Sequence, residues 1–472
     1  MKGMRAQGMA LLVVASLLCS AFSTGAEAAE SESKATAPRL RSQRSYLLPA
    51  LETAALHFGF LAFNNANGQE FGLVTWESTR GAFDGTRPWT FDHDTFFTNQ
   101  LGHPVQGMLV HAAARSSGLD FWEAGAYTFA ASLAWELFFE PDRPSINDQI
   151  TTALGGVLLG EAMHRLFRIL VDRDDPSTRT LRELTAAVLS PTSALNRWLF
   201  DDRFGARPER PRGLYAHAGL GLSVGPRLLT PEDTAPVQGG LVMRLRYGGP
   251  ALAEPKTYRP LEHHELELAG AAPVASGVEL HLRGLIAGSG FRTARDGLRG
   301  LWGLYGQYDL AMNDAARISG VGLGLGTELD GELGRQWSLQ GTALLSLLGA
   351  AASGVVDPEA AEGRDYLLGP GTGLLLSMRA VRREVGMLGL HLRRWRVAGV
   401  WTAPIGRFDA TTHLTAEVGV MLSRRLVLGL QAPVTFQRSE TAGERNVLGA
   451  DGLRITLGVA TDGGFGAARE RR

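Results

Sequence analysis

The sequence predicts an α+β chain, in which an N-terminal helical domain of about four helices precedes a C-terminal antiparallel β-barrel of about 12 strands. Two changes along the chain carry this prediction. Apolar residues recur with the period of a helix as far as about residue 172, and from about residue 213 they alternate with the period of a strand. An export signal at the start of the chain favours a membrane barrel as the β part.

The first residues have the form of a secretory signal peptide. Basic residues precede an apolar run over residues 9–22, and the small-residue pattern Ala-Glu-Ala follows at 26–28. This run is too short and wrongly flanked for a stable membrane anchor. We therefore expect residues 1–28 to be a signal peptide and residues 29–45 to be a flexible lead.

Composition excludes several classes of site and partner. The formal net charge is −1 at pH 7, which gives no reason to expect a nucleic-acid partner. The single cysteine, Cys19, lies inside the expected signal peptide. The mature chain would then hold no thiol, which excludes disulfides, cysteine metal sites and cysteine nucleophiles. The 59 glycines suit closely packed strands.

The helical domain is expected over residues 46–172. Its segments with the helical period lie at 46–63, 94–117, 121–139 and 146–171. The ends of these segments carry matching signals, because Gly118 predicts a C-terminal stop and Asp120 and Ser145 predict N-caps. Residues 173–212, which include a joint rich in Pro and Arg, are expected to be a linker.

The barrel is expected over residues 213–465. In the segment 214–224, for example, aliphatic residues occupy every second position. Arg, Glu and His repeatedly take the opposite face, as Glu279, His281 and Arg283 do. A transmembrane barrel needs this division between a lipid-facing exterior and a polar lumen, and its closure leaves no strand edge unpaired. A soluble sandwich would also alternate, and it is the alternative fold.

The C-terminus departs from the usual pattern of outer-membrane barrels, which often finish on an aromatic residue. Phe465 is the candidate for that residue, with residues 466–472 as a tail behind it. This departure is the main support for the alternative of a soluble periplasmic all-β protein with a helical cap.

Polar residues interrupt the apolar helices in rows of spacing four, which places each row on one helix face. Pro104 follows His103 in the first row and should bend the helix or open its first turn. The rows suggest one shared interior network, whose members are Asn99, His103, Arg115, Trp135, Glu136, Glu140, Ser145, Asp148, Glu161 and Arg165. Since an unpaired buried carboxylate is costly, we expect Arg115, Arg143 and Arg165 to be the counter-charges.

This network has two interpretations. In the structural one it fixes helix packing, and its charges keep the helices polar enough to avoid arrest in the inner membrane during export. In the functional one, a polar site binds a ligand or a metal or moves a proton, and its residues are His103, Glu136, Glu140, Asp148 and Glu161. The pair Gly155-Gly156 would let another helix or a ligand approach closely.

The same motifs resemble an uncharacterised bacterial domain-of-unknown-function family. They are Asn99-x-x-x-His103-Pro104, Arg115-Ser116-x-Gly118, Trp135-Glu136-x-x-x-Glu140, Pro144-Ser145-x-x-Asp148, Gly155-Gly156 and Gly160-Glu161, and the stretch "WGLYGQYDLAMNDAARISGVGLGLG" is similar to the family's strand region. The resemblance spans most of residues 90–330. It implies an exported, outer-membrane protein, and it supplies no reaction.

Two functional hypotheses follow. The first is an outer-membrane barrel with a helical plug or periplasmic domain, in a ligand-binding or structural role; the chain holds no complete catalytic motif. The second is an envelope enzyme, a hydrolase acting on lipid with or without a metal, in which His103 is the general base and Glu136 or Glu140 orients it or holds the metal.

These hypotheses set the expected surroundings of the protein. No cofactor is expected, apart from a divalent metal at the His/Glu cluster under the second hypothesis. The expected partners are outer-membrane lipid, the barrel-assembly machinery and a small-molecule or lipid ligand of unknown identity. The expected location is the outer membrane, with the periplasm as the alternative.

Overall fold

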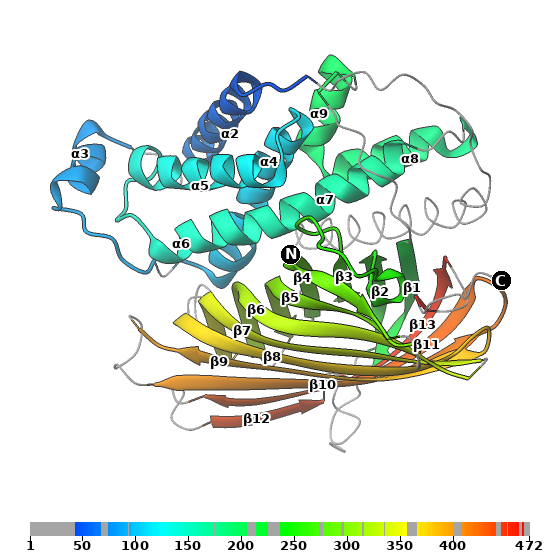
Figure 1. Ribbon diagram of the computed structural model, residues 1–472. Coiled ribbons are helices and arrows are strands. Elements are labelled where there is room, and N and C mark those ends of the chain that lie inside the picture. Colours follow the sequence, from blue (N-terminus) through cyan, green and yellow to red (C-terminus); the bar gives the residue numbers. More distant parts are fainter. Residues whose placement is uncertain are drawn as a thin grey trace. The chain divides into compact units, whose positions relative to one another are not determined.

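The computed structural model describes residues 43–67, 74–92, 94–172, 176–201, 203–204, 214–224, 237–272, 277–293, 297–313, 316–334, 336–355, 366–400, 407–439, 445–450, 452–461 and 465–466. The chain divides into two compact units. The described part of the helical unit lies between residues 43 and 204, and that of the β unit between residues 214 and 466 (Figure 1). The expected signal peptide and most of the expected lead lie outside the described residues.

The helical unit contains each of the helical segments that the sequence predicts. Its α-helices are α2 (Leu47–Ala66), α3 (Trp76–Asp84), α4 (His103–Ser116), α5 (Phe121–Phe138), α6 (Ile146–Ile150), α7 (Gly156–Val171), α8 (Arg179–Leu189) and α9 (Pro191–Phe200). Two π-helical segments, η3 (Thr98–Gly102) and η4 (Thr151–Gly155), lead into α4 and α7. Helices α8 and α9 occupy much of the range that the sequence predicts to be a linker.

Local signals explain where these helices begin and end. Gly118 ends α4 with φ at +87°, a conformation that an L side chain rarely adopts. Asp120 then caps α5, because its side chain accepts from the backbone N–H groups of Trp122 and Glu123, and the Glu123 side chain accepts from the Asp120 N–H. Ser145 caps α6 by accepting from the Asp148 N–H at 3.1 Å.

Helices α4 and α7 pack closely because glycines meet at their crossing. A Cβ atom on Gly107 would lie 2.0 Å from the backbone carbonyl oxygen of Thr152, and one on Gly156 would lie 2.5 Å from the Gly107 Cα atom. The close approach predicted for Gly155-Gly156 is therefore made by Gly156. Helix α2 is the one helix of the described residues that is long and apolar enough, by length and composition, to cross a membrane.

The β unit is a closed antiparallel barrel of 12 strands, as predicted. Its strands are β1 (Leu214–Val224), β2 (Val237–Tyr247), β3 (His264–Ala272), β4 (Gly277–Arg292), β5 (Arg299–Asn313), β6 (Ala316–Leu333), β7 (Trp337–Val355), β8 (Leu367–Arg382), β9 (Gly386–Ala398), β10 (Phe408–Met421), β11 (Leu426–Ser439) and β13 (Leu453–Ala460). Each strand pairs with the next in the chain, and β13 pairs with β1 to close the ring. The short β12 (Arg445–Ala450) continues the last strand beside β11.

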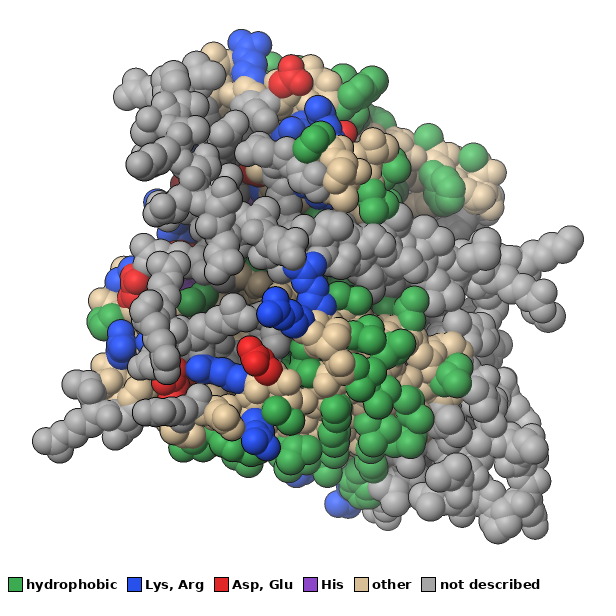
Figure 2. All heavy atoms as spheres, turned by 90° about the vertical axis from the view of Figure 1, so that its right-hand side faces the viewer, with side chains coloured by type: hydrophobic (Ala, Val, Ile, Leu, Met, Phe, Trp, Pro, Cys, Tyr) green, Lys and Arg blue, Asp and Glu red, His purple; other side chains and the backbone are tan. Residues whose placement is uncertain are grey.

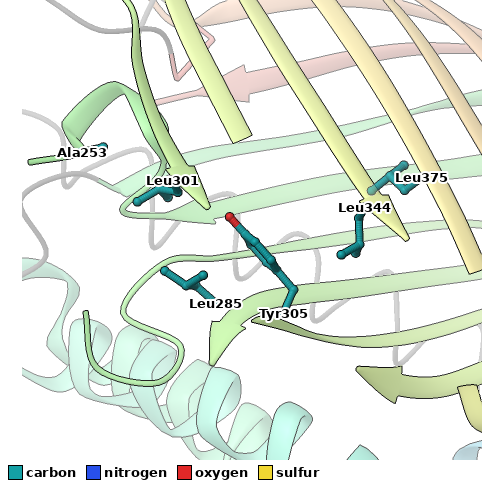
Figure 3. Packing of buried hydrophobic residues seen from close by; sticks show 6 residues of the cluster. All are labelled: Ala253, Leu285, Leu301, Tyr305, Leu344 and Leu375. Carbon is teal, nitrogen blue, oxygen red and sulfur yellow. The ribbon is translucent and has the colours of Figure 1, made fainter. Parts of the chain in front are cut away.

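The inner face of the barrel holds small apolar clusters as well as polar residues. Leu285, Leu301 and Tyr305 pack with Ala253, Leu344 and Leu375 (Figure 3). A second cluster contains Phe465, which is 3% exposed and packs with Tyr215 and Val381. Phe465 follows β13 rather than ending it, because that strand finishes at Ala460. It is therefore not the last strand's final residue.

The outer face of the barrel is apolar. Figure 2 shows hydrophobic side chains gathered over the barrel on the face that it presents. Their positions alternate with buried polar ones, so that on β9 Leu388 and Leu390 are exposed while His391 and Arg393 are buried. The alternation read from the sequence therefore places the aliphatic residues outside and the charged residues inside.

Candidate functional site

The polar row of residues 99–115 lies along the contact of η3 and α4 with α6, η4 and α7. His103, at the start of α4, faces Asp148 and Thr152, and His111, two turns later, faces Glu161. Gly107 and Gly156 separate these two groups. The single network that the sequence predicts is therefore two clusters, which differ in their charge balance.

The first cluster is centred on Glu161 and is compensated in charge. The Glu161 carboxylate accepts from Arg115 Nε at 2.7 Å and from Arg165 Nε at 2.8 Å. His111 Nε2 lies 3.2 Å from the same carboxylate. Burial alone would raise the pKa of Glu161, but Arg115 and Arg165 outweigh it and hold the pKa well below its usual value of 4.5. This cluster has the properties of the structural interpretation.

The second cluster is an acidic cluster around His103. His103 Nε2 lies 3.6 Å from Asp148 Oδ1, and His103 Nδ1 lies 3.2 Å from Thr152 Oγ1. The Glu136 carboxylate accepts from the Ser145 backbone N–H at 2.7 Å. No Arg or Lys of the described residues forms an ion pair with Glu136, Glu140 or Asp148, so this cluster lacks the expected counter-charges. Arg143, one of those expected, is exposed.

Burial and mutual repulsion make these carboxyls weak acids. Burial, with the like charges of Glu140 and Asp148, raises the pKa of Glu136 well above 4.5. Burial and Asp148 raise the pKa of Glu140 to about 8. Burial likewise raises the pKa of Asp148 well above 3.8 and lowers the pKa of His103 below 6.5. Each of these pKa shifts therefore favours the uncharged form of its group.

Two further features distinguish the acidic cluster, namely the adjacent π-helical segments and two buried oxygens without partners among the described residues. The π-helical segments η3 and η4 lie on either side of it, immediately before α4 and α7; such segments are frequent at functional sites. Two buried oxygens, Asp148 Oδ2 and Glu140 Oε2, have no hydrogen-bond partner among the described residues. The arrangement can therefore donate or accept a proton or bind a polar ligand group.

The other predicted residues support the two clusters. Asn99 is buried in η3, and its side-chain nitrogen donates to the backbone carbonyl oxygen of Asp92 at 3.3 Å. Trp135 stacks on Phe139 with ring centroids 5.9 Å apart, and so it packs rather than joining the acids. The sequence reasoning missed Asn147, which accepts from the Asp92 backbone N–H at 2.7 Å. The signal for it was its position beside Asp148.

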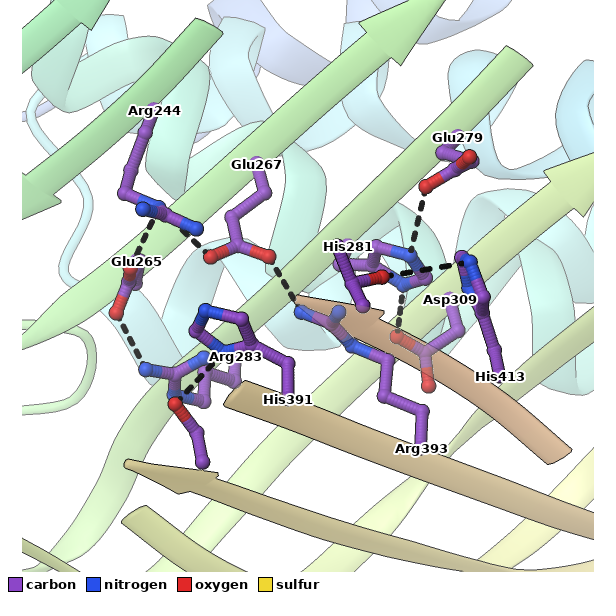
Figure 4. Close-up of polar contacts among 12 residues, drawn as sticks. Arg244, Glu265, Glu267, Glu279, His281, Arg283, Asp309, His391, Arg393 and His413 are labelled. Atoms are coloured by element: carbon purple, nitrogen blue, oxygen red, sulfur yellow. Dashed lines mark hydrogen bonds and ion pairs between the residues drawn. The ribbon is translucent and has the colours of Figure 1, made fainter. Parts of the chain in front are cut away.

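The sequence reasoning also missed a second polar assembly, which lies inside the barrel. The sequence predicts a polar face that includes Glu279, His281 and Arg283, but not the partners of these residues. Arg244 Nε lies 2.8 Å from Glu267 Oε1, and Arg379 Nε lies 3.0 Å from Glu417 Oε1 (Figure 4 draws part of this assembly). Arg244, Arg379 and Glu417 are buried, each with 9% or less of its surface exposed. We call this assembly the lumen network.

The lumen network links strands that are distant in the sequence. Besides the pairs above, it includes Arg246 with Glu265, Arg283 with Glu265 and Glu328, Arg379 with Glu265 and Glu267, Arg393 with Glu267, and His391 with Glu417. Charges of both signs therefore neutralise one another within the barrel, as buried charges must.

Comparison with known proteins agrees with the resemblance seen in the sequence. Comparison with curated protein sequences finds no match. Among solved structures, an outer membrane channel from Pseudomonas putida F1 is 12% identical over 54% of this chain and 98% of that chain, with a TM-score of 0.26. The β domain of the Bordetella autotransporter BrkA is 16% identical over 52% of this chain and 98% of that chain, with a TM-score of 0.20. TM-scores of this size support no inference about function.

A family model matches the part of the chain that holds both clusters of the helical unit. The match covers residues 88–192, which run from before Asn99 to beyond Arg165, and it ends before the β unit. The resemblance to a domain-of-unknown-function family is thereby confirmed for residues 88–192, whereas the predicted similarity of the strand region lies outside the match. Residues 88–192 of this chain match the model of the family described as Domain of unknown function (DUF3943).

Proposed function

We propose that this chain is an integral outer-membrane protein in a structural or ligand-binding role, whose barrel is closed to solute flow by its own side chains. The observation that carries the proposal is the division of the barrel wall into an apolar outer face and a charged inner face. A soluble barrel has no need of an apolar exterior, because large exposed apolar surfaces mark a contact with membrane or protein.

The outer face has the composition that lipid requires. Leu347 on β7 is 75% exposed and Leu325 on β6 is 71% exposed. Neighbouring strands contribute further exposed aliphatic residues, namely Leu345, Leu376, Met378, Leu388, Leu390, Leu414, Leu428, Ile455 and Leu457. Exposure in water would be unfavourable for a continuous surface of this kind, whereas a bilayer core accepts it.

Two exposed tryptophans lie at one end of this apolar surface. Trp302 and Trp337 are exposed near the starts of β5 and β7, which lie at the same end of the barrel because both strands run in the same direction. Tryptophan is enriched where a membrane meets water, since its ring is apolar and its N–H is polar. These two residues support an interfacial position for that end.

The lumen network supports the closed state of the barrel. Arg393 on β9 and Glu267 on β3 meet within the lumen, as do Arg379 on β8 and Glu417 on β10. Three cavities lined by described residues of the lumen measure about 30 Å³, about 10 Å³ and about 10 Å³. Spaces of that size hold about one or two water molecules, so these cavities leave no room for a larger solute. The expected role of the helical domain as a plug or periplasmic domain stays a prediction.

The test is membrane fractionation of the expressed chain, followed by gel mobility with and without boiling in detergent and by conductance in a planar bilayer. We expect outer-membrane recovery, a heat-dependent mobility shift and no stepwise conductance. Recovery as a soluble periplasmic protein without a mobility shift would overturn the membrane assignment. Stable conductance steps would overturn the closed lumen while leaving the membrane assignment intact.

A second candidate function uses the acidic cluster of the helical unit. Under it the chain is an envelope enzyme, a hydrolase acting on lipid, with neutral His103 as the general base and Glu136 or Glu140 orienting it. The observation that favours it is a set of carboxyls, buried or partly buried, that have no Arg or Lys partner among the described residues and lie beside the partly buried His103. Perturbed groups of this kind concentrate at functional sites.

This second candidate is tested with phosphatidylethanolamine vesicles as the probe. Fatty-acid release by the purified chain, lost in H103A and E136A variants that still accumulate in the membrane, would support an enzyme. An E183Q variant, which changes an exposed glutamate of α8, is the control and should keep full activity. If the unmodified chain releases no fatty acid, the proposed lipid hydrolysis is wrong. If H103A and E136A fail to accumulate, a role of these residues in helix packing is favoured.

A further inference from the structure

A group of three potential metal ligands lies in the lumen. Among the described residues, Glu279, His281 and His413 are the one group of three or more His, Asp or Glu whose ligand atoms all lie within 4.8 Å of one another. Glu279 and His281 are on β4, and His413 is on β10. Strands β4 and β10 stand six places apart in a ring of 12, so the group joins opposite walls (Figure 4).

A hydrogen bond fixes which ring nitrogen of His281 carries the proton and which one faces this group. His281 Nδ1 lies 2.7 Å from Asp309 Oδ1, so the ring donates its Nδ1–H to that carboxylate. The lone pair of the neutral ring is then on Nε2. His281 is 6% exposed, and its buried Nε2 atom has no hydrogen-bond partner in the part of the chain that the structure describes. A buried acceptor without a partner is costly unless something occupies it.

The Asp309 carboxylate is itself held in place. Trp395 Nε1 donates to Asp309 Oδ2 at 2.9 Å, and Gln307 donates to the same oxygen. Trp395 also stacks on the His281 ring with centroids 6.1 Å apart. A carboxylate that orients a histidine through its other ring nitrogen is the usual support of a metal-binding imidazole.

Glu279 can bind an ion with one carboxylate oxygen while the other remains paired with Arg454. Its Oε1 atom accepts from Arg454, and its Oε2 atom lies 4.0 Å from His281 Nε2. One oxygen is therefore held by the guanidinium while the other faces the imidazole. The cavities of about 30 Å³ and about 10 Å³ both have Glu279 in their walls, the first with His281 and the second with His413.

We propose that Glu279, His281 and His413 bind one divalent transition-metal ion, with zinc as the preferred ion. Two imidazoles and one carboxylate form a donor set that zinc takes in proteins, and water would complete its coordination. Hard cations such as calcium and magnesium prefer sites built from oxygen alone. The ion would tie β4 to β10 across the lumen and would supply the partner that His281 Nε2 lacks.

The experiment uses the purified full chain in detergent, stripped with EDTA and titrated with Co²⁺, whose visible absorption reports tetrahedral coordination. Zn²⁺ is then added as the competitor. We expect one equivalent of Co²⁺ with visible absorption bands, displaced by Zn²⁺. D309N should keep the site and weaken its affinity about 10- to 100-fold, because the orienting hydrogen bond changes.

Single variants decide whether these three residues form the site. H281A and H413A should lose the absorption bands, and H217A, which removes another histidine of the barrel outside the group, should keep them. Heat-dependent mobility checks that each variant is folded, and H413A, on a different strand, serves if H281A does not fold. Absence of binding by the unmodified chain, or equal binding by folded H281A or H413A, would overturn the proposal.

Discussion

Arg393 on β9 forms an ion pair with Glu267 on β3 across the full width of the lumen. These strands stand six places apart in a ring of 12, so they face each other. The ion pair of Arg379 on β8 with Glu267 joins nearly the same two walls. The lumen network therefore acts as an internal brace, and its loss should change both the stability of the barrel and the passage of solutes.

The brace can be tested by E267Q. Glu267 also pairs with Arg244 and Arg379, so the variant leaves buried guanidinium groups with too few acceptors. Removal of one partner of a buried ion pair costs about 3–5 kcal/mol. We expect a lower temperature for the heat-dependent mobility shift. The control is E332Q, whose partly exposed pair with Arg383 should matter little, and an equal change in both variants would contradict the brace.

The close crossing of α4 and α7 at Gly107 predicts that G107A destabilises the helical unit. The added Cβ would lie 2.0 Å from the Thr152 carbonyl oxygen, so α4 and α7 must separate. Overpacking of this kind costs typically about 1–3 kcal/mol. The control is G59A on α2, where a Cβ meets nothing within 4 Å and should stabilise the helix slightly. Urea unfolding followed by circular dichroism at 222 nm compares them, and equal stability would contradict the packing.

The compensated cluster predicts loss of stability in E161Q. Gln cannot neutralise Arg115 and Arg165, which both bind the buried carboxylate. The free energy of unfolding of the helical unit should fall by about 3–5 kcal/mol. The exposed pair of Glu183 with Arg179 has the same i,i+4 spacing as the pair of Glu161 with Arg165, and E183Q should cost about 1 kcal/mol or less. Similar losses in both variants would show that burial of Glu161 is unimportant.

Glu161 also predicts a loss of stability in acid. Its folded-state pKa lies well below the usual 4.5, because Arg115 and Arg165 outweigh the effect of burial. A depressed carboxyl pKa contributes stability that is present above the unfolded pKa and is lost as pH falls through the folded pKa. We expect the helical unit to lose stability below about pH 4.5 and E161Q to lose less. A parallel acid profile for E161Q would contradict this assignment.

The acidic cluster predicts the opposite pH dependence. Burial and Asp148 raise the pKa of Glu140 to about 8 in the folded state, against a usual 4.5. A raised carboxyl pKa contributes stability that is complete below the unfolded pKa and is lost as pH rises through the folded pKa. We expect the helical unit to become less stable between about pH 4.5 and pH 8. Gln has no carboxyl to ionise, so E140Q should be more stable than the unmodified chain at pH 8, and its stability should depend less on pH. An unchanged dependence of stability on pH would contradict the assignment to Glu140.

The sequence by itself determined the architecture, because both periods are local properties of the chain. A helix turns once in 3.6 residues and a strand alternates in two, so the change of period separates the two units without knowledge of contacts. Capping residues such as Asp120 and Ser145 likewise act on backbone groups only a few residues away. For the same reason the row from Asn99 to Arg115 was recognisable as one helix face.

Only the tertiary structure decided which charges are paired. The sequence offered Arg115, Arg143 and Arg165 as counter-charges for the whole network. In the structure Arg115 and Arg165 both bind Glu161, while Arg143 is exposed. In the barrel, Arg393 and Glu267 are 126 positions apart. Coulomb energy depends on distance and burial, and for residues so separated these quantities exist only once the helices have packed and the ring has closed.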